Sequence, residues 1–150
     1  MILEKGNMWS IFPATHIFMI TTNPVIKNNG GVVMGRGIAK QAKDRWKRLP
    51  FVFGKNLQKS GYRNIGRIGD FNGTSIWWFM VKSHWAENAK LDIIQASTDM
   101  LDENFGNGIE KELRLRVDLN FPGIGNGGLE REAVLPILQK LPDNIHIWEM

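Results

Sequence analysis

Two glycine-rich segments have the residue types and spacing of a phosphate-binding site. The first runs from Asn28 to Gly37 and the second from Pro122 to Gly128, where four of the six residues from Gly123 onward are glycine. Glycine adopts positive φ angles without strain and lets a ligand approach backbone amides closely. Each segment follows an apolar strand-like run and precedes a helix-like pattern, whose free N–H groups attract anions. One such segment alone suits a flexible connection, but two at equivalent strand ends predict a phosphate cradle.

Two common nucleotide-binding motifs do not fit the first segment. The run from Gly35 to Lys40 begins like a dinucleotide-binding turn, but Lys40 stands where the third glycine belongs. The connection from Thr22 is also too long for that tight turn. The chain contains no P-loop signature ending in Gly-Lys-Ser/Thr, so that class of nucleotide site is excluded.

Few side chains have the chemistry of catalytic groups. The chain has no cysteine, and we find no carboxylate pair, metal-ligand cluster or Ser-His-Asp arrangement, so we predict that neither a metal ion nor a cofactor takes part. His84, which follows an apolar run, is the best candidate base. Asp70 can serve as a base only if it points into the cleft, and Asn23 can position water or ribose. A plain surface position is the commoner role for residues such as His84 and Asp70.

The elements that must position these residues alternate between strand-like and helix-like segments. Strands are predicted at 16–22, 64–71, 74–82, 113–121 and 145–148, with Asn72-Gly73 as a hairpin turn. Apolar spacing predicts helices at 38–49, 52–59, 91–105 and 131–141; Pro50 is expected to stop the first, and Pro136 to delay or kink the last. This order predicts one α/β domain over residues 1–150, with a central mixed sheet and helices on both faces.

Positive charge is concentrated in one part of the chain. The net charge is +4, and between Arg36 and Arg67 ten Lys and Arg residues face a single acid, Asp44. Such a patch favours an anionic partner, although solvated surface is the commonest explanation.

The N-terminus lacks a signal-peptide run, and no apolar stretch reaches the roughly 20 residues that span a bilayer. We therefore expect a soluble, cytoplasmic, monomeric protein without a membrane partner.

The two loops together resemble those of a known family. Asn23, Gly30-Gly31-Val32, the run Met34 to Ala39 and the run Pro122 to Leu129 resemble the ligand loops of the macro domain, particularly its phage and bacterial branch. Gly6-Asn7-Met8-Trp9 resembles that family's N-terminal Gly-Asp-Ile/Leu motif, and residues 145–150 resemble its closing strand. The similarity covers essentially the whole chain, and its specificity comes from both loops occurring in this order and spacing.

The resemblance implies a three-layer α/β/α fold with a cleft for ADP-ribose or a related nucleotide. By analogy, Asn23 contacts the distal ribose, the first loop approaches that ribose and the diphosphate, and the second loop closes over the phosphates. Trp148 would face the adenine, where stacking contributes roughly 1–3 kcal/mol; a core position is equally compatible. The implied ligand-binding residues are Asn7, Met8, Asn23, Gly30, Gly31, Val32, Met34, Gly35, Pro122, Gly123, Ile124, Gly125, Asn126, Gly127 and Trp148.

Two residues depart from the family pattern. The family has Asp after the glycine of its N-terminal motif, where this chain has Asn7. An Asn carbonyl accepts a hydrogen bond from adenine more weakly because it lacks charge, so we expect a relaxed preference for adenine. The branch that uses a catalytic lysine carries it just before the turn that we place at Asn72-Gly73, and this chain has Asp70 there. Lysine-adduct chemistry is therefore not expected.

Two reactions are implied by the family: hydrolysis of ADP-ribose 1″-phosphate, and removal of ADP-ribosyl or acetyl groups, with ADP-ribosylated macromolecules as possible partners. The first choice is thus an ADP-ribose 1″-phosphate phosphatase or ADP-ribosyl hydrolase, with Asn23, His84 and Asp70 as candidate catalytic residues. A catalytically silent ADP-ribose reader is one alternative. The other is a nucleic-acid-binding module, whose backbone contacts would come from Lys40, Lys43, Arg45, Trp46, Lys47 and Arg48.

Overall fold

The computed structural model describes residues 1–150 and contains one six-stranded sheet with the order β1-β6-β5-β2-β4-β3. Neighbouring strands are parallel except for β3 and β4, which form an antiparallel hairpin. The mixed sheet predicted from the sequence is confirmed. The strands are β1 (Ile2–Lys5), β2 (Ile17–Thr22), β3 (Ile65–Phe71), β4 (Thr74–Met80), β5 (Val117–Asn120) and β6 (Ile145–Glu149).

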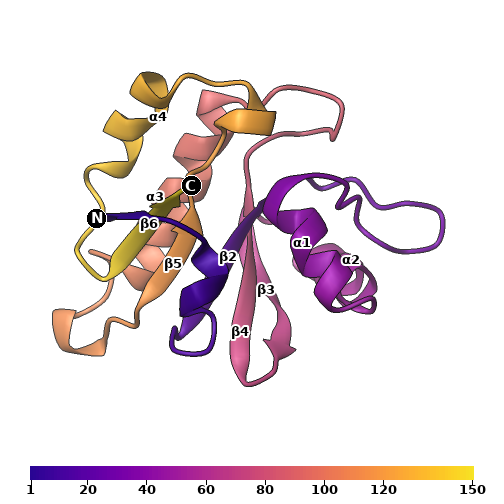
Figure 1. Ribbon diagram of the computed structural model, residues 1–150, viewed down its shortest axis with the longest axis horizontal. Helices are drawn as coiled ribbons and strands as arrows, with labels where there is room; N and C mark the ends of the chain where they lie inside the picture. Colours follow the sequence, from indigo (N-terminus) through magenta and orange to yellow (C-terminus); the bar gives the residue numbers. More distant parts are fainter.

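Helices cover both faces of the sheet, which gives the three layers of an α/β/α fold (Figure 1). Helices α3 (Leu91–Phe105) and α4 (Arg131–Leu138) pack on one face, and α1 (Gly37–Arg45) and α2 (Leu49–Lys59) pack on the other. Three short 3-10 helices complete the structure: η1 (Met8–Ile11), η2 (Lys111–Leu113) and η3 (Gly125–Gly127). None of the helices combines the length and apolarity that a membrane span requires.

Strand β2 lies between the two hydrophobic cores. Ile17 and Met19 point into the core beneath α3 and α4, whereas Phe18 and Ile20 point into the core beneath α1 and α2. All four side chains are buried, as expected for a continuous apolar run with parallel neighbours on both sides. The carboxyl end of β2 therefore lies in the middle of the sheet, between the carboxyl ends of β4 and β5.

The boundary between the first two helices differs from the prediction. We expected one helix to run to Leu49 and stop at Pro50, but α1 ends at Arg45 and α2 begins at Leu49. Proline is tolerated in the first turn of a helix, where its missing N–H has no intrahelical partner. Pro50 therefore starts α2 instead of ending α1. Trp46 lies between the helices and packs against an aromatic group of Trp9, Phe12 and Phe71.

Two other boundaries also differ, and one strand was missed. The strand predicted at 113–121 is limited to β5, because Leu113 and Leu115 are exposed and the segment before β5 forms η2. The last helix begins at Arg131 and continues through Pro136, so a delayed start was wrong. Strand β1 was not predicted, since four residues at a sheet edge carry too little periodicity. The hairpin turn was correct: Asn72 and Gly73 have φ angles of 52° and 85°.

Candidate ligand-binding cleft

Both glycine-rich segments lie at the same end of the sheet. Strands β2 and β5 are parallel neighbours, so the loops that follow them leave the sheet on the same side (Figure 1). The two segments also approach each other closely, because a Cβ on Gly37 would lie 3.6 Å from Nδ2 of Asn126. They therefore border one shared space instead of two separate ones.

A cleft of about 640 Å³ occupies this space. Small-molecule and cofactor sites span roughly 300–1,000 Å³, so the cleft is large enough for a dinucleotide-sized ligand. Its walls come from the carboxyl ends of β2, β4 and β5, the two glycine-rich segments and the start of α1. The lining residues are Thr21, Thr22, Asn23, Val25, Lys27, Val33, Met34, Gly35, Arg36, Gly37, Ile38, Ala39, Val81, Lys82, Trp85, Asn120, Phe121, Gly123, Ile124, Asn126 and Gly127.

Asn23 closes the base of the first loop. Its Nδ2 donates to the carbonyl oxygen of Val33 at 3.0 Å, and its Oδ1 accepts from the N–H of Val25 at 2.9 Å. The side chain also lines the cleft. Because an amide has two hydrogens and a carbonyl oxygen with two lone pairs, one hydrogen and one lone pair remain for a ligand. Asn23 thus has a structural role in the loop and lies on the cleft wall, where its predicted ligand contact stays a prediction.

The outer half of the first loop lies away from the cleft, unlike the prediction. Ile26 and Val32 form an isolated antiparallel bridge that folds the loop back on itself. Gly30 is absent from the cleft wall, and Gly31 and Val32 border a separate hollow of about 280 Å³ beside Phe51. The contribution of this loop to the cleft comes from the residues after the bridge, including the predicted Met34 and Gly35.

The second loop needs its glycines for backbone geometry. Gly123, Gly125 and Gly128 have φ angles of 80°, 63° and 76°, values that side-chain-bearing residues rarely adopt. The loop is closed by a hydrogen bond from Leu129 N to Gly123 O at 2.9 Å.

Only part of the second loop reaches the ligand space. Gly123, Ile124, Asn126 and Gly127 line the cleft as predicted, whereas Pro122 and Gly125 do not. A Cβ on Gly123 would lie 2.5 Å from Cδ1 of Ile94, so this glycine also packs closely against α3. The backbone between Gly123 and Gly127 therefore forms one wall of the cleft.

All charged residues on the cleft wall are positive. Lys27, Arg36 and Lys82 line the cleft, and none of its lining residues is Asp, Glu or His. No ion pair in the structure involves any of these three cations. Three cations without a neutralising carboxylate form a site for an anionic group.

Lys82 is a cleft residue that the sequence analysis missed. It follows Val81 at the carboxyl end of β4, next to the end of β2. Its pKa is lowered from the usual lysine value, first by burial and second by repulsion from Arg36. The signal was present in the sequence, since a polar residue just after a buried strand in an α/β sheet points to the ligand side. Lys82, and not the Asp70 position before the hairpin turn, therefore brings a lysine to the cleft wall.

Asp70 does not lie at the cleft. It pairs with Ser75 near the start of β4, whereas the cleft is at the other end of that strand. Its Oδ2 accepts from Nη2 of Arg67 at 2.6 Å, and both side chains are exposed. The antiparallel direction of β3 carries Asp70 to the opposite edge of the sheet. The structure thus gives Asp70 no place among the catalytic candidates.

His84 lies next to the cleft but not on its wall. Its Nδ1 accepts the N–H of Ala86 at 3.0 Å, and its ring lies 5.2 Å from the ring of Trp85. Because Nδ1 is an acceptor here, a neutral His84 carries its proton on Nε2. These contacts stabilise the connection between β4 and α3. Because His84 is not on the cleft wall, its predicted role as a base has no geometric support. Trp85, which was not predicted, lines the cleft instead.

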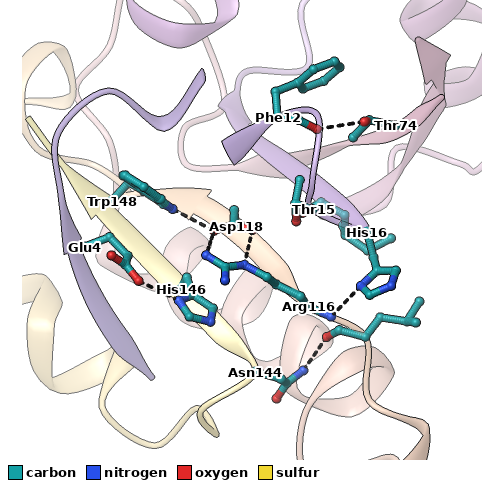
Figure 2. Close-up of polar contacts among 12 residues, drawn as sticks. Glu4, Phe12, Thr15, His16, Thr74, Arg116, Asp118, Asn144, His146 and Trp148 are labelled. Atoms are coloured by element: carbon teal, nitrogen blue, oxygen red, sulfur yellow. Dashed lines mark hydrogen bonds and ion pairs between the residues drawn. The ribbon is translucent and has the colours of Figure 1, made fainter. Parts of the chain in front are cut away.

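Three of the predicted ligand-binding residues, Asn7, Met8 and Trp148, have structural contacts of their own. Asn7 caps η1 by accepting the N–H of Trp9 at 3.0 Å, and Met8 is buried in the core. Trp148 Nε1 donates to Oδ1 of Asp118 at 2.8 Å (Figure 2). None of the three lines the cleft. The hydrogen bond from Trp148 to Asp118 supports a core position for this tryptophan over stacking on a base.

Asp118 is a fully buried carboxylate in the middle of β5. It receives two hydrogen bonds from Arg116, at 3.0 and 3.1 Å, besides the one from Trp148 (Figure 2). Asp118→Asn removes the charge that accepts these hydrogen bonds and leaves Arg116, whose side chain is partly exposed, without its partner. We expect Asp118→Asn to lower the free energy of unfolding by about 2 kcal/mol, measured by urea denaturation. Asp99→Asn, which breaks an exposed pair with Lys140, is the matched control and should cost less than about 0.5 kcal/mol. Equal losses in the two variants would contradict a structural role for the buried network.

Comparison with known proteins places this geometry in a family. No family model and no curated protein matches the chain. Among solved structures, the macrodomain of Mycobacterium tuberculosis DarG is 30% identical, with a TM-score of 0.68, over 99% of this chain and 98% of that one. This chain is a macro domain. The structural similarity extends to the macrodomain of Thermus aquaticus DarG, with 22% identity, a TM-score of 0.69 and coverage of 98% and 95%.

A longer protein contains the same fold. The structure of Thermosipho africanus DarTG in complex with ADP-ribose matches this macro domain with a TM-score of 0.76 and 21% identity. The match covers 98% of this chain but 41% of the DarTG chain. The macro domain described here therefore spans less than half of that relative.

Proposed function

We propose that this macro domain binds ADP-ribose, with the diphosphate between the start of α1 and the second glycine-rich loop. The observation that carries the proposal is the cleft wall: three cations, no carboxylate, and two backbone segments that meet across it. The complex of the related DarTG protein with ADP-ribose supports the same ligand. A diphosphate is negatively charged and would neutralise the positive charge of this wall.

The start of α1 supplies amides as well as charge. Arg36 caps this helix without a side-chain hydrogen bond, so the N–H groups of the first turn have no partner within the helix. Gly37, Ile38 and Ala39 line the cleft at that turn. Unpaired N–H groups and the helix dipole together favour a phosphate at this position.

The proposed reaction is removal of a group from C1″ of the distal ribose. The cleft wall has no carboxylate or histidine to act as a general base, which disfavours direct activation of water by such a group. It does have Lys82, whose lowered pKa increases the fraction of neutral amine. A desolvated lysine beside another cation is a known form of activated nucleophile.

Lys82 can carry this reaction through a covalent adduct. Its Nζ attacks C1″, the bond from C1″ to the attached group breaks, and the electron pair leaves with that group. Opening of the ribose ring and loss of the amine proton give an imine, to which water adds. Collapse of that adduct releases ADP-ribose and restores the amine. The same step releases phosphate from ADP-ribose 1″-phosphate or a side chain or base from an ADP-ribosylated macromolecule.

Binding and adduct formation are tested separately. ADP-ribose at about 100 times its Kd should raise the melting temperature by about 5–10 °C, and AMP should have a smaller effect because it lacks the second phosphate and the distal ribose. Incubation with ADP-ribose and cyanoborohydride should reduce the imine, which mass spectrometry would locate on Lys82. No thermal response to ADP-ribose would disprove the binding proposal. Binding without an adduct or turnover would leave a catalytically silent reader.

The nucleic-acid-binding alternative has weaker geometric support. Arg45 lies 4.0 Å above the ring of Trp9, and Lys40 is paired with Asp44, so two of its six residues are engaged within the molecule. Trp46, the aromatic residue of that set, packs against other aromatic rings. The cationic cleft is therefore the better-supported anion site.

A further inference from the structure

Trp85 has an unusual position for a tryptophan. It lies on the connection between β4 and α3, lines the cleft, and exposes 51% of its surface. Large aromatic side chains bury most of their area in folded proteins, and those left open beside a cleft commonly mark a binding surface. No core cluster of the structure includes Trp85, so its exposure has no explanation in the packing of the fold.

The segment that carries Trp85 is held at several points. Lys90 N donates to Val81 O at 2.9 Å, which closes the base of the connection. Glu87 N donates to His84 O at 3.1 Å, and the Glu87 carboxylate bonds to Ser83 Oγ and pairs with Lys90 Nζ, both at 3.2 Å.

The same segment is joined to the second glycine-rich loop. Ala89 N donates to Gly127 O at 2.8 Å, and Gly127 lines the cleft. Trp85 is therefore presented from a braced loop whose position is tied to the opposite wall of the cleft. A rigid aromatic platform loses little conformational entropy when a ligand covers it.

The topology places Trp85 at one particular end of the cleft. Lys82 and Trp85 both follow β4, whereas the second glycine-rich loop, which is proposed to hold the diphosphate, follows β5. Strand β2 lies between β4 and β5. A ligand that places its distal ribose near Lys82 therefore brings whatever that ribose carries toward Trp85.

We propose that Trp85 is a specificity-determining residue that stacks on a flat ring carried by C1″ of the distal ribose. This inference rests on the proposed function, because it assumes that ADP-ribose occupies the cleft with its distal ribose near Lys82. A planar ring offers a face to the indole, whereas a tetrahedral phosphate offers none. The site then favours ADP-ribosyl groups attached to planar rings over the 1″-phosphate.

NADH is a suitable probe because it is ADP-ribose with a flat, uncharged ring on C1″. Its affinity and that of ADP-ribose are to be measured by calorimetry for the wild type, Trp85→Ala, Trp85→Phe and Phe51→Ala. Phe51 is the matched control, since it is an aromatic residue of similar exposure, 46%, outside the cleft. Stacking predicts that the wild type binds NADH at least about fivefold more tightly than ADP-ribose.

Trp85→Ala should abolish this preference by weakening NADH binding at least about fivefold more than ADP-ribose binding, and Trp85→Phe and Phe51→Ala should retain the preference. A wild type that binds the two ligands equally, or an unchanged preference in Trp85→Ala, would overturn the inference while leaving ADP-ribose binding established. Failure of the wild type to bind ADP-ribose would instead refute the proposed function, and the inference with it.

Discussion

Gly35→Glu is expected to abolish ADP-ribose binding without unfolding the domain. Gly35 lines the cleft, a Cβ added to it meets no atom within 4 Å, and its φ angle lies outside the positive region. A glutamate at this position therefore fits the fold but places a carboxylate where the diphosphate is proposed to lie. Like charges held together in a binding site cost several kcal/mol, so we expect an affinity loss of at least about 100-fold by calorimetry.

The control for this substitution separates charge from size. Gly35→Gln has nearly the same volume but no charge, and it should lose substantially less affinity than the glutamate variant. Both variants should unfold at the same urea concentration as the wild type within error. Tight ADP-ribose binding by Gly35→Glu would show that the diphosphate lies elsewhere. Gly123 is unsuitable for such a test, because its φ is 80° and an added Cβ would clash with Ile94.

Lys82→Gln should remove turnover while leaving most of the binding. If the amine of Lys82 is the nucleophile, its loss should lower kcat by at least about 1,000-fold. Lys27 and Arg36 still provide two cations for the diphosphate, so ADP-ribose affinity should fall by no more than about tenfold. Release of the group attached to C1″ measures the first effect, and calorimetry measures the second. A variant that keeps its turnover would exclude Lys82 as the nucleophile.

The pH dependence of the rate provides a second test of Lys82. The neutral amine is the reactive form, so the rate should rise with pH until the amine is fully deprotonated. Because its pKa is lowered in the folded protein, the rate should level off at a lower pH than for an ordinary lysine. Arg36→Gln removes one cause of that lowering and should move the plateau to higher pH. Lys27→Gln changes another cation of the cleft wall and should move it less.

Local patterns were sufficient for much of the fold. The apolar run of β2 predicted a strand buried on both faces, and the spacing of apolar residues predicted the bounds of α3. Asn72-Gly73 predicted the hairpin between β3 and β4. Such features depend on neighbours within a few residues, and the same physical preferences act on them in the sequence and in the folded chain.

The glycine-rich loops were recognisable for a similar reason. Glycines with positive φ after β5 are required by backbone geometry, which the amino-acid sequence records directly. The outer first loop was assigned less well, because the bridge between Ile26 and Val32 turns Gly30 and Gly31 away from the cleft. Whether a glycine reaches a ligand depends on how its loop folds, and glycine content alone does not reveal it.

By itself, then, the sequence determined five of the six strands, most of the helices and the presence of two glycine-rich loops after buried strands. The tertiary structure decided which side chains surround the cleft. Strand β4 runs parallel to β2, so Lys82 and Trp85 reach the ligand side, whereas the antiparallel β3 carries Asp70 to the other edge. Strand direction in a sheet is set by pairing between segments far apart in the chain, and no local pattern of residues encodes it.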